Sequence, residues 1–170
     1  MDNQQETKVA YIAGLMEGEG HFGIHRLNLK SGVQYRANIT FTNTDRILIE
    51  EFVRFCKHHL IKHHIRTDVR KNGHRVCWTV SITSINSRLQ LIALLKPYLR
   101  GLKRRQAEIL ENFVANRSIK NSNHISERDE NGRFVTGGRA KFDHLDEALF
   151  KQYRETRDPQ RLHANLLEIG

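Results

Sequence analysis

The sequence predicts an α+β domain whose antiparallel sheet is covered by helices on one face. Two features of the 170-residue chain predict it. Apolar residues with helical spacing alternate along the chain with runs of period two, which are typical of half-buried strands. The strand-like runs also come in pairs, each pair joined by a turn signal of the kind found in hairpins. The expected order is therefore helix, hairpin, helix, hairpin, helix, helix.

The first helix is expected over residues 9–19, and strands are expected over 22–30 and 33–41. In the first strand the apolar residues change phase near His25 and Arg26, which indicates a β-bulge or a sharp bend there. The second strand alternates regularly, and its polar side has few acids. The sequence Lys30-Ser31-Gly32 between the two is a turn signal.

The second helix–hairpin unit is expected from a helix over 45–59 and strands over 64–71 and 75–83. The dipeptide Asn72-Gly73 between these strands is the strongest short hairpin signal. Helices over 87–95 and 102–115 complete a core spanning 1–116. A polar loop or arm is expected over 117–141 and a helical extension over 142–170, where Asp158-Pro159 predicts the start of a last short helix.

The charge of the chain favours a polyanionic partner. The formal net charge is +9, and residues 1–116 hold 18 basic against 10 acidic side chains. Nucleic acid is the commonest partner of such a surface, although a merely basic soluble protein is the alternative. The absence of a membrane-spanning run or signal peptide indicates an intracellular protein, in a prokaryotic or phage-infected cytoplasm or in an organelle.

Two cysteines, Cys56 and Cys77, are too few for a disulfide framework and fit a reducing compartment. Cys56, His59 and His63 have helical spacing that resembles part of a zinc site. No compact four-ligand pattern follows unless Cys77 folds back from a distant strand. We therefore interpret these histidines as a polar helix end that leads into a strand.

The sheet face opposite the helices is expected to be basic and rich in amides. Arginine and asparagine side chains pair with bases in the major groove, while lysine and threonine also reach phosphates, and a two-stranded ribbon fits in that groove. An ordinary solvated face is the alternative, but only one acid interrupts the set. The predicted DNA-binding residues are Arg26, Asn28, Lys30, Arg36, Asn38, Thr40, Thr42, Arg66, Asp68, Arg70, Arg75 and Thr79.

The helix ending at Gly20 departs from ordinary helix composition in two ways. Small residues share one face, and glycine inside a helix costs about 1 kcal/mol relative to alanine. Close approach of a second helix backbone would explain them, so we predict a dimer interface at Ala10, Ala13, Gly14, Glu17 and Gly18. Glu17 and Glu19 also stand at the negative end of the helix dipole, where carboxylates are unfavourable unless a cation joins them.

Magnesium is such a cation, because it combines one or two carboxylates with waters and substrate phosphates. Two packed helices would bring one carboxylate from each chain near a shared axis, an arrangement suited to cutting both strands of a duplex. Metal ions there would activate water and stabilise charge on the phosphate.

The segment Ile12-Ala-Gly-Leu-Met-Glu-Gly-Glu-Gly20 resembles the nonapeptide that names the LAGLIDADG homing endonucleases, with glutamates in place of aspartates. Phe22, the two hairpins and the stretch from Pro97 to Ala107 also look like this family. The resemblance covers about residues 9–116. It implies an αββαββα fold with a saddle-shaped sheet that binds double-stranded DNA, with extra C-terminal helices here. A single copy of the motif implies a homodimer and a long, nearly palindromic target.

The resemblance also implies site residues. Glu19 would bind the catalytic Mg²⁺, for which Mn²⁺ substitutes and with which Ca²⁺ competes without supporting cleavage, and Gly18 would offer its carbonyl to the metal. Lys103 would polarise water or phosphate, and Asp45, with Asn43 as a near neighbour, would order water. Glu17 is expected to be structural.

The sequence departs from the family pattern at one catalytic position. A basic residue expected in the helix after the second strand falls on Ile49. Arg46 is the candidate to replace it as a catalytic residue.

The predicted function is therefore a site-specific, metal-dependent DNA endonuclease of the intron-homing type. The alternative is a catalytically silent DNA- or RNA-binding protein of the same fold, either an intron maturase or a transcription regulator. A small-molecule enzyme would need a nucleotide loop or a nucleophile elbow, and neither is present. The segment Gly137–Phe142 is expected to form a DNA-contacting arm, or to lead into a helix that packs on the core or braces the dimer.

Overall fold

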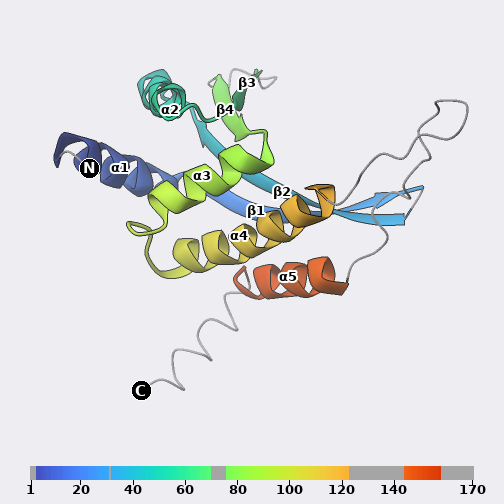
Figure 1. Cartoon of the computed structure of the whole chain (residues 1–170). Coiled ribbons are helices and arrows are strands. Elements are labelled where there is room, and N and C mark those ends of the chain that lie inside the picture. The colour runs from blue at the N-terminus through green and yellow to red at the C-terminus, as the bar shows by residue number, and fades with distance from the viewer. Residues whose placement is uncertain (1–2, 31, 70–75, 123–143, 158–170) are drawn as a thin grey trace, which may run out of the picture.

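The computed structural model describes residues 3–30, 32–69, 76–122 and 144–157, without the side chains of 118–122. The predicted order of elements is confirmed, and Figure 1 shows their arrangement. The elements are α1 (Asn3–Gly18), β1 (Gly20–Leu29), β2 (Gly32–Asn43), α2 (Arg46–His58), β3 (His63–Asp68), β4 (Cys77–Ile82), α3 (Ile85–Leu95), α4 (Gly101–Ser122) and α5 (His144–Glu155).

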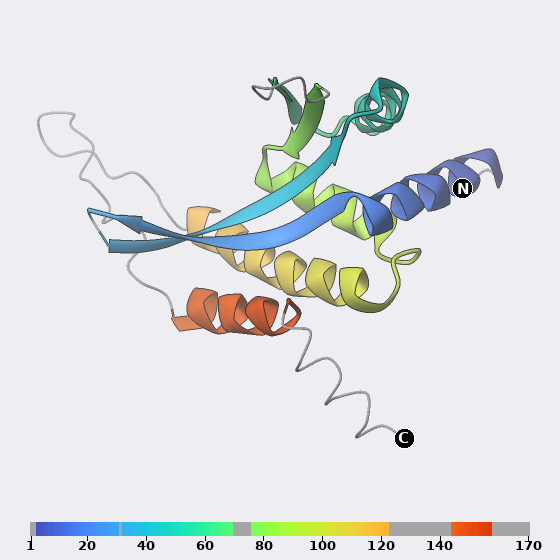
Figure 2. The same cartoon turned by 180° about the vertical axis from the view of Figure 1, so that it is seen from behind.

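The four strands form one antiparallel sheet in the order β1-β2-β4-β3. The two hairpins are therefore joined through β2 and β4, the second strand of each. The β1–β2 hairpin is the longer one, and its tip projects beyond the helices in both views (Figures 1 and 2). The fold class predicted from the sequence, α+β with a helix-covered antiparallel sheet, is confirmed.

The predicted β-bulge near His25 and Arg26 is wrong. The pairing of β1 with β2 runs without interruption from Gly20↔Phe41 to Leu29↔Gly32. The phase change in the sequence has another cause: this part of the hairpin lies beyond the core, so neither of its sides must be apolar. Leu29, for example, is 49% exposed.

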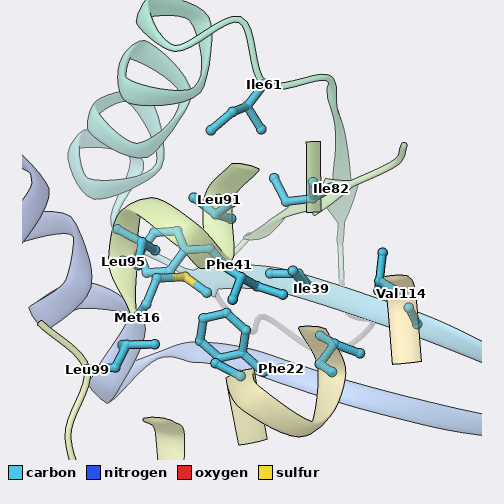
Figure 3. Close-up of a cluster of buried hydrophobic side chains, with 14 of the residues drawn as sticks. Met16, Phe22, Ile39, Phe41, Ile61, Ile82, Leu91, Leu95, Leu99 and Val114 are labelled. Carbon is cyan, nitrogen blue, oxygen red and sulfur yellow. The ribbon is translucent and has the colours of Figure 1, made fainter. Parts of the chain in front are cut away.

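The hydrophobic core lies between the sheet and the helices α1 to α4. Phe22 of β1, Ile39 and Phe41 of β2 and Ile82 of β4 meet Leu91 and other apolar residues of the helices (Figure 3). Burial of one such side chain contributes about 1.5–3 kcal/mol. Because side chains alternate across a strand, the neighbours of these core residues in each strand point to the opposite side of the sheet.

Several predicted boundaries change. Helix α1 begins at Asn3 rather than at residue 9. Helix α4 continues to Ser122, so the first residues of the predicted loop over 117–141 are helical. The hairpin turn at Asn72-Gly73, the remainder of that loop and the short helix predicted from Asp158-Pro159 lie outside the described residues. No helix among the described residues combines the length and apolar character that a membrane span needs.

The C-terminal helix α5 packs against α4 and the β1–β2 hairpin. Phe150 stacks on Tyr35 with ring centroids 5.1 Å apart. The buried Asp146 carboxylate pairs with Arg117 at 2.7 Å, and Thr156 just beyond the helix accepts a hydrogen bond from Gln106. The helix of the extension is therefore part of the folded core, as one of the alternatives for this segment predicted.

Candidate active site and nucleic-acid interface

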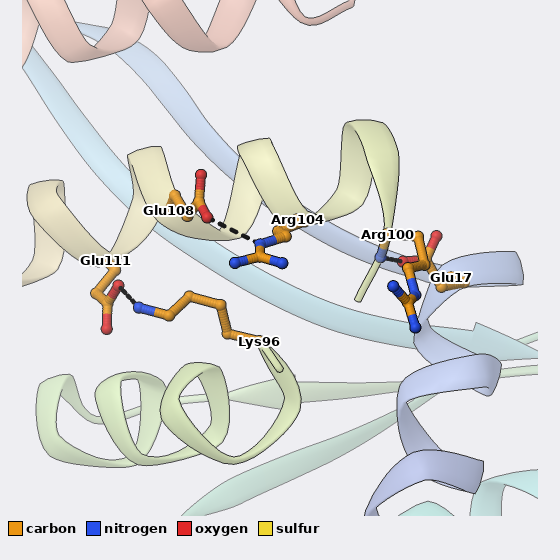
Figure 4. Close-up of polar contacts among 6 residues, drawn as sticks. All are labelled: Glu17, Lys96, Arg100, Arg104, Glu108 and Glu111. Carbon is orange, nitrogen blue, oxygen red and sulfur yellow. Dashed lines mark hydrogen bonds and ion pairs between the residues drawn. The ribbon is translucent and has the colours of Figure 1, made fainter. Parts of the chain in front are cut away.

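Glu17, in the last turn of α1, and Glu19, just after the helix, lie in different environments. The Glu17 carboxylate accepts a hydrogen bond of 2.5 Å from the backbone N–H of Arg100, just before α4 (Figure 4). Glu17 therefore fastens α1 to the start of α4, as its expected structural role requires. Glu19 is exposed, and its carboxylate has no hydrogen-bond or ion-pair partner among the described residues. Only the second of these carboxylates is free to meet a ligand.

Lys103, in the first turn of α4, lies beside these carboxylates. Its ammonium donates a hydrogen bond to the backbone carbonyl of Gly20. Burial lowers the pKa of Lys103, while the charges of Glu17 and Glu19 act in the opposite direction. A side chain at Gly20 would meet the backbone of Met16 at 2.6 Å, so the tight exit from α1 requires glycine. The fold thus brings a cation and a free carboxylate together from distant parts of the sequence.

The donor set at this point fits a hard divalent cation only in part. The last carbonyls of a helix have no partner within it, so the carbonyl of Gly18 is a second oxygen next to Glu19. Among the described residues no group of three or more His, Cys, Asp or Glu side chains is arranged to hold a metal ion. One chain therefore offers too few oxygens for a closed metal cage, but enough for Mg²⁺ that also binds waters and phosphates.

Asp45 and Arg46, the two other predicted catalytic residues, have different roles in the structure. The Asp45 carboxylate is the N-cap of α2 and accepts from the N–H of Ile47 at 2.8 Å. Arg46 is exposed and pairs with Glu50 at 2.8 Å. Ile49, at the position of the expected basic residue, is only 4% exposed and belongs to the core. The position therefore carries a core side chain in this protein, and no basic group reaches the site from it.

The sheet face opposite the core carries an open polar groove. We call it the outer groove, and it is lined by Asn38, Thr40, Thr42, His64, Arg66, Thr67, Asp68, Val69, Cys77, Thr79 and Ser81. Six of these residues are among the predicted DNA-binding set. Arg66 pairs with Asp68 at 2.9 Å, and the hydroxyls of Thr42 and Thr79 lie 3.0 Å apart. The other five, His64, Thr67, Val69, Cys77 and Ser81, were not predicted to bind DNA.

Three predicted DNA-binding residues lie elsewhere. With no bulge in β1, Arg26 and Asn28 share the side of the strand that carries Phe22 and Ile24, and Lys30 is in the turn. Arg36 pairs with His25 and so lies on the same side of the sheet as Asn38, but it lines a separate pocket together with Arg88 instead of the outer groove. Arg70 and Arg75 lie outside the described residues.

On β1 the side facing away from the core carries histidines instead of the predicted basic residues. The continuous pairing places His21, Gly23 and His25 there. His25 lies 3.2 Å from the amide nitrogen of Asn38, which lines the outer groove. These histidines could have been found by extending the alternation from Phe22 and Ile24 without a phase change.

Of the two histidines on this side of β1, His21 is the nearer in sequence to Glu19, and it is half-buried. Its ring meets Tyr153 of α5 edge-on, with centroids 6.5 Å apart. Burial lowers the pKa of His21, and the positive neighbours His25, Arg157 and Lys103 lower it further. The C-terminal helix thus reaches the surroundings of Glu19 and Lys103.

Part of the face predicted for the dimer interface is exposed on α1, although the predicted interface residue Glu17 is bonded to Arg100 within the chain. Ala10, Gly14 and Gly18 are exposed, and a Cβ at either glycine would have no neighbour within 4 Å. Ala13 is a correction: it is fully buried, because it lies about 100° round the helix from Gly14 and packs into the core. Tyr11, 42% exposed, extends this open face.

The histidine- and cysteine-rich end of α2 forms no metal site within the described residues. Cys56 is fully buried, and burial raises the pKa of its thiol to about 12. The ring of His59 stacks on Phe55 at 4.5 Å. These side chains are parts of a helix end, as interpreted from the sequence.

Comparison with known proteins identifies the family. The model of the LAGLIDADG endonuclease family matches residues 12–124, more than half of the chain. No curated protein matches the chain.

Solved homing endonucleases share the fold. They include I-CvuI in complex with a DNA target and Mg²⁺, with 17% identity and a TM-score of 0.53 over 92% of this chain and 99% of that one. The archaeal intron-encoded I-Vdi141I, complexed with DNA, has 19% identity and a TM-score of 0.55 over 90% and 98%. I-TnaI has 13% identity and a TM-score of 0.56 over 95% and 97%. With its single motif, the chain belongs to the LAGLIDADG homing endonuclease family.

Proposed function

We propose that this protein is a metal-dependent endonuclease that cuts both strands of a long, nearly palindromic DNA site as a homodimer. The free carboxylate of Glu19 beside the ammonium of Lys103 is the observation that carries the proposal. A silent DNA-binding protein would have no need to keep a carboxylate without a partner at the negative end of a helix.

The chain's own residues would bind the metal and stabilise charge. Glu19 and the carbonyl of Gly18 would hold Mg²⁺, which supplies activation of water and stabilisation of charge at the phosphate. Lys103, held by the carbonyl of Gly20, would neutralise charge on the attacked phosphate. The ion pair of Arg46 with Glu50 and the capping bond of Asp45 favour structural roles for these two residues.

A second copy of the chain would complete the enzyme. Among the residues that the structure describes, one chain offers one free carboxylate at the site, whereas cutting two strands requires two sites. The exposed face of Ala10, Gly14 and Gly18 leaves room for another helix backbone to approach closely. Its position next to Glu19 would place the two sites near the dimer axis.

The outer groove is the proposed DNA-binding surface. Its amide, hydroxyl and guanidinium groups offer the donors and acceptors that read base edges in the major groove. The net charge of +9 would attract the phosphates, so binding should weaken steeply as salt is raised.

Selection from a randomised duplex library, incubated in parallel with Mg²⁺ and Ca²⁺, tests the proposal. The wild-type protein should yield site-specific double-strand cuts in Mg²⁺ and binding without cuts in Ca²⁺. Glu19→Gln should abolish the cuts and retain binding. Glu50→Gln, which alters an exposed carboxylate on α2, is the matched control and should cut normally. Selective binding without any cutting by the wild-type protein would instead indicate a maturase or a transcription regulator.

A further inference from the structure

His21 carries an imidazole that the proposed chemistry leaves without a role. It follows Glu19 and Gly20 directly and lies on the side of β1 that faces away from the core. The pairing places it opposite Thr40, which lines the outer groove. Neither ring nitrogen makes a hydrogen bond with a described residue. A half-buried imidazole with free ring nitrogens is therefore present between the groove and the carboxylate of Glu19.

The ring of His21 is held in a defined place. Its Nε2 atom lies 2.3 Å, and the Tyr153 hydroxyl oxygen 2.9 Å, from the position that a Cβ at Gly23 would occupy. Any side chain at 23 would displace the imidazole or the tyrosine. The edge-on contact with Tyr153 covers one side of the ring. Glycine on the strand and tyrosine on α5 together fix an orientation that a surface histidine would not otherwise keep.

Tyr153 is itself buried and belongs to a helix that packs firmly on the core. It is 3% exposed, and α5 is fastened to the core by the contact of Phe150 with Tyr35 and by the pairing of Asp146 with Arg117. The aromatic ring that covers His21 thus belongs to a rigid helix.

We propose that His21 contacts a DNA phosphate beside the cleaved bond, and that Tyr153 of the C-terminal helix is the positioning residue that holds it there. The inference rests on the proposed endonuclease function. An imidazole N–H is a hydrogen-bond donor to a phosphate oxygen. Lys103 is bonded to the carbonyl of Gly20, the residue directly before His21, so the fold holds both groups next to Glu19. The C-terminal helix α5 then serves the active site directly.

Single-turnover cleavage in Mg²⁺ and equilibrium binding in Ca²⁺, both on the selected duplex, test this assignment. His21→Ala should lower the cleavage rate constant about tenfold to a hundredfold, with Kd changed by less than about threefold. Tyr153→Leu should also lower the cleavage rate constant and leave Kd nearly unchanged. The loss in rate should be smaller, about threefold to tenfold, because the imidazole is present but loosely held. Tyr153→Phe keeps the ring that covers His21 and should restore most of the rate.

The double variant separates positioning from general destabilisation. If Tyr153 acts through His21, Tyr153→Leu should cost almost nothing more when His21 is already alanine. Phe150→Leu is the matched control, since it weakens the packing of the same helix on Tyr35 without touching His21. It should lower the melting temperature and leave the cleavage rate of the folded protein unchanged. Additive losses, or an equal loss in Phe150→Leu, would overturn the positioning role.

A second measurement does not depend on cleavage. The imidazole resonances of His21, assigned by their loss in His21→Ala, should shift when the duplex is added in Ca²⁺. The shift should shrink in Tyr153→Leu and persist in Tyr153→Phe. A wild-type protein that binds DNA without cutting it would refute the endonuclease function. The shift of the imidazole resonances would still show whether His21 contacts the DNA. Resonances unmoved by DNA would refute the inference alone.

Discussion

The ammonium of Lys103 is bonded to the carbonyl of Gly20, so the first turn of α4 is tied to the residue that directly follows Glu19. Glu17 ties the same two segments together through the N–H of Arg100. Two contacts between distant parts of the chain therefore set the distance between the proposed metal carboxylate and its neighbouring cation.

Replacing Lys103 tests whether that cation acts in the reaction. Lys103→Met keeps the aliphatic stem and should lower the cleavage rate constant about a hundredfold to a thousandfold. Binding in Ca²⁺ should change little, because one phosphate contact is a small part of a long interface. Lys96→Met, which breaks the pair with Glu111 on the helix side, is the control. Equal effects of the two variants on cleavage would argue against a catalytic role for Lys103.

The open face of α1 gives a prediction about assembly. Gly14→Leu should be tolerated within the chain, since a Cβ there meets nothing within 4 Å. A second helix could no longer approach closely, so the variant should sediment as a monomer and lose double-strand cleavage. Ala93→Leu, at an exposed position of α3, adds similar bulk elsewhere and should remain dimeric. A Gly14→Leu protein that is still a dimer would place the interface on another surface.

The sequence was enough for the fold, because periodicity has local physical causes, and the resemblance to the family was enough to single out Glu19 and Lys103, which the fold brings near each other. It was not enough where a residue's position depended on how elements distant in sequence pack against each other. Arg26 was assigned to the wrong side of β1 because the apolar pattern ends where the hairpin extends beyond the core, while the strand pairing continues without a bulge. The role of His21 depended on α5, which approaches it only in the folded chain. Ala13 was misplaced because small residues suit a core as well as an interface.

Asp45 offers a test that separates capping from catalysis. Asp45→Ala removes the acceptor for the N–H of Ile47 and should lower the free energy of unfolding by about 1 kcal/mol in urea titrations. Asp45→Asn keeps a good N-cap but removes the charge, so both its stability and its cleavage rate should match the wild type. A stable Asp45→Asn protein with a large loss of cleavage would restore the catalytic role predicted from the sequence.

Chemical labelling of the two native cysteines can test whether DNA binds in the outer groove. Cys77 lines the groove and is partly exposed, whereas Cys56 is fully buried with its thiol pKa raised to about 12. Only thiolate reacts with alkylating reagents, so at pH 8 Cys77 should be modified in the folded protein and Cys56 only after unfolding. A bound duplex in Ca²⁺ should then slow the labelling of Cys77, as mass spectrometry of the two peptides would measure. Labelling of Cys77 at the same rate with and without DNA would mean that the duplex lies on a different surface of the sheet.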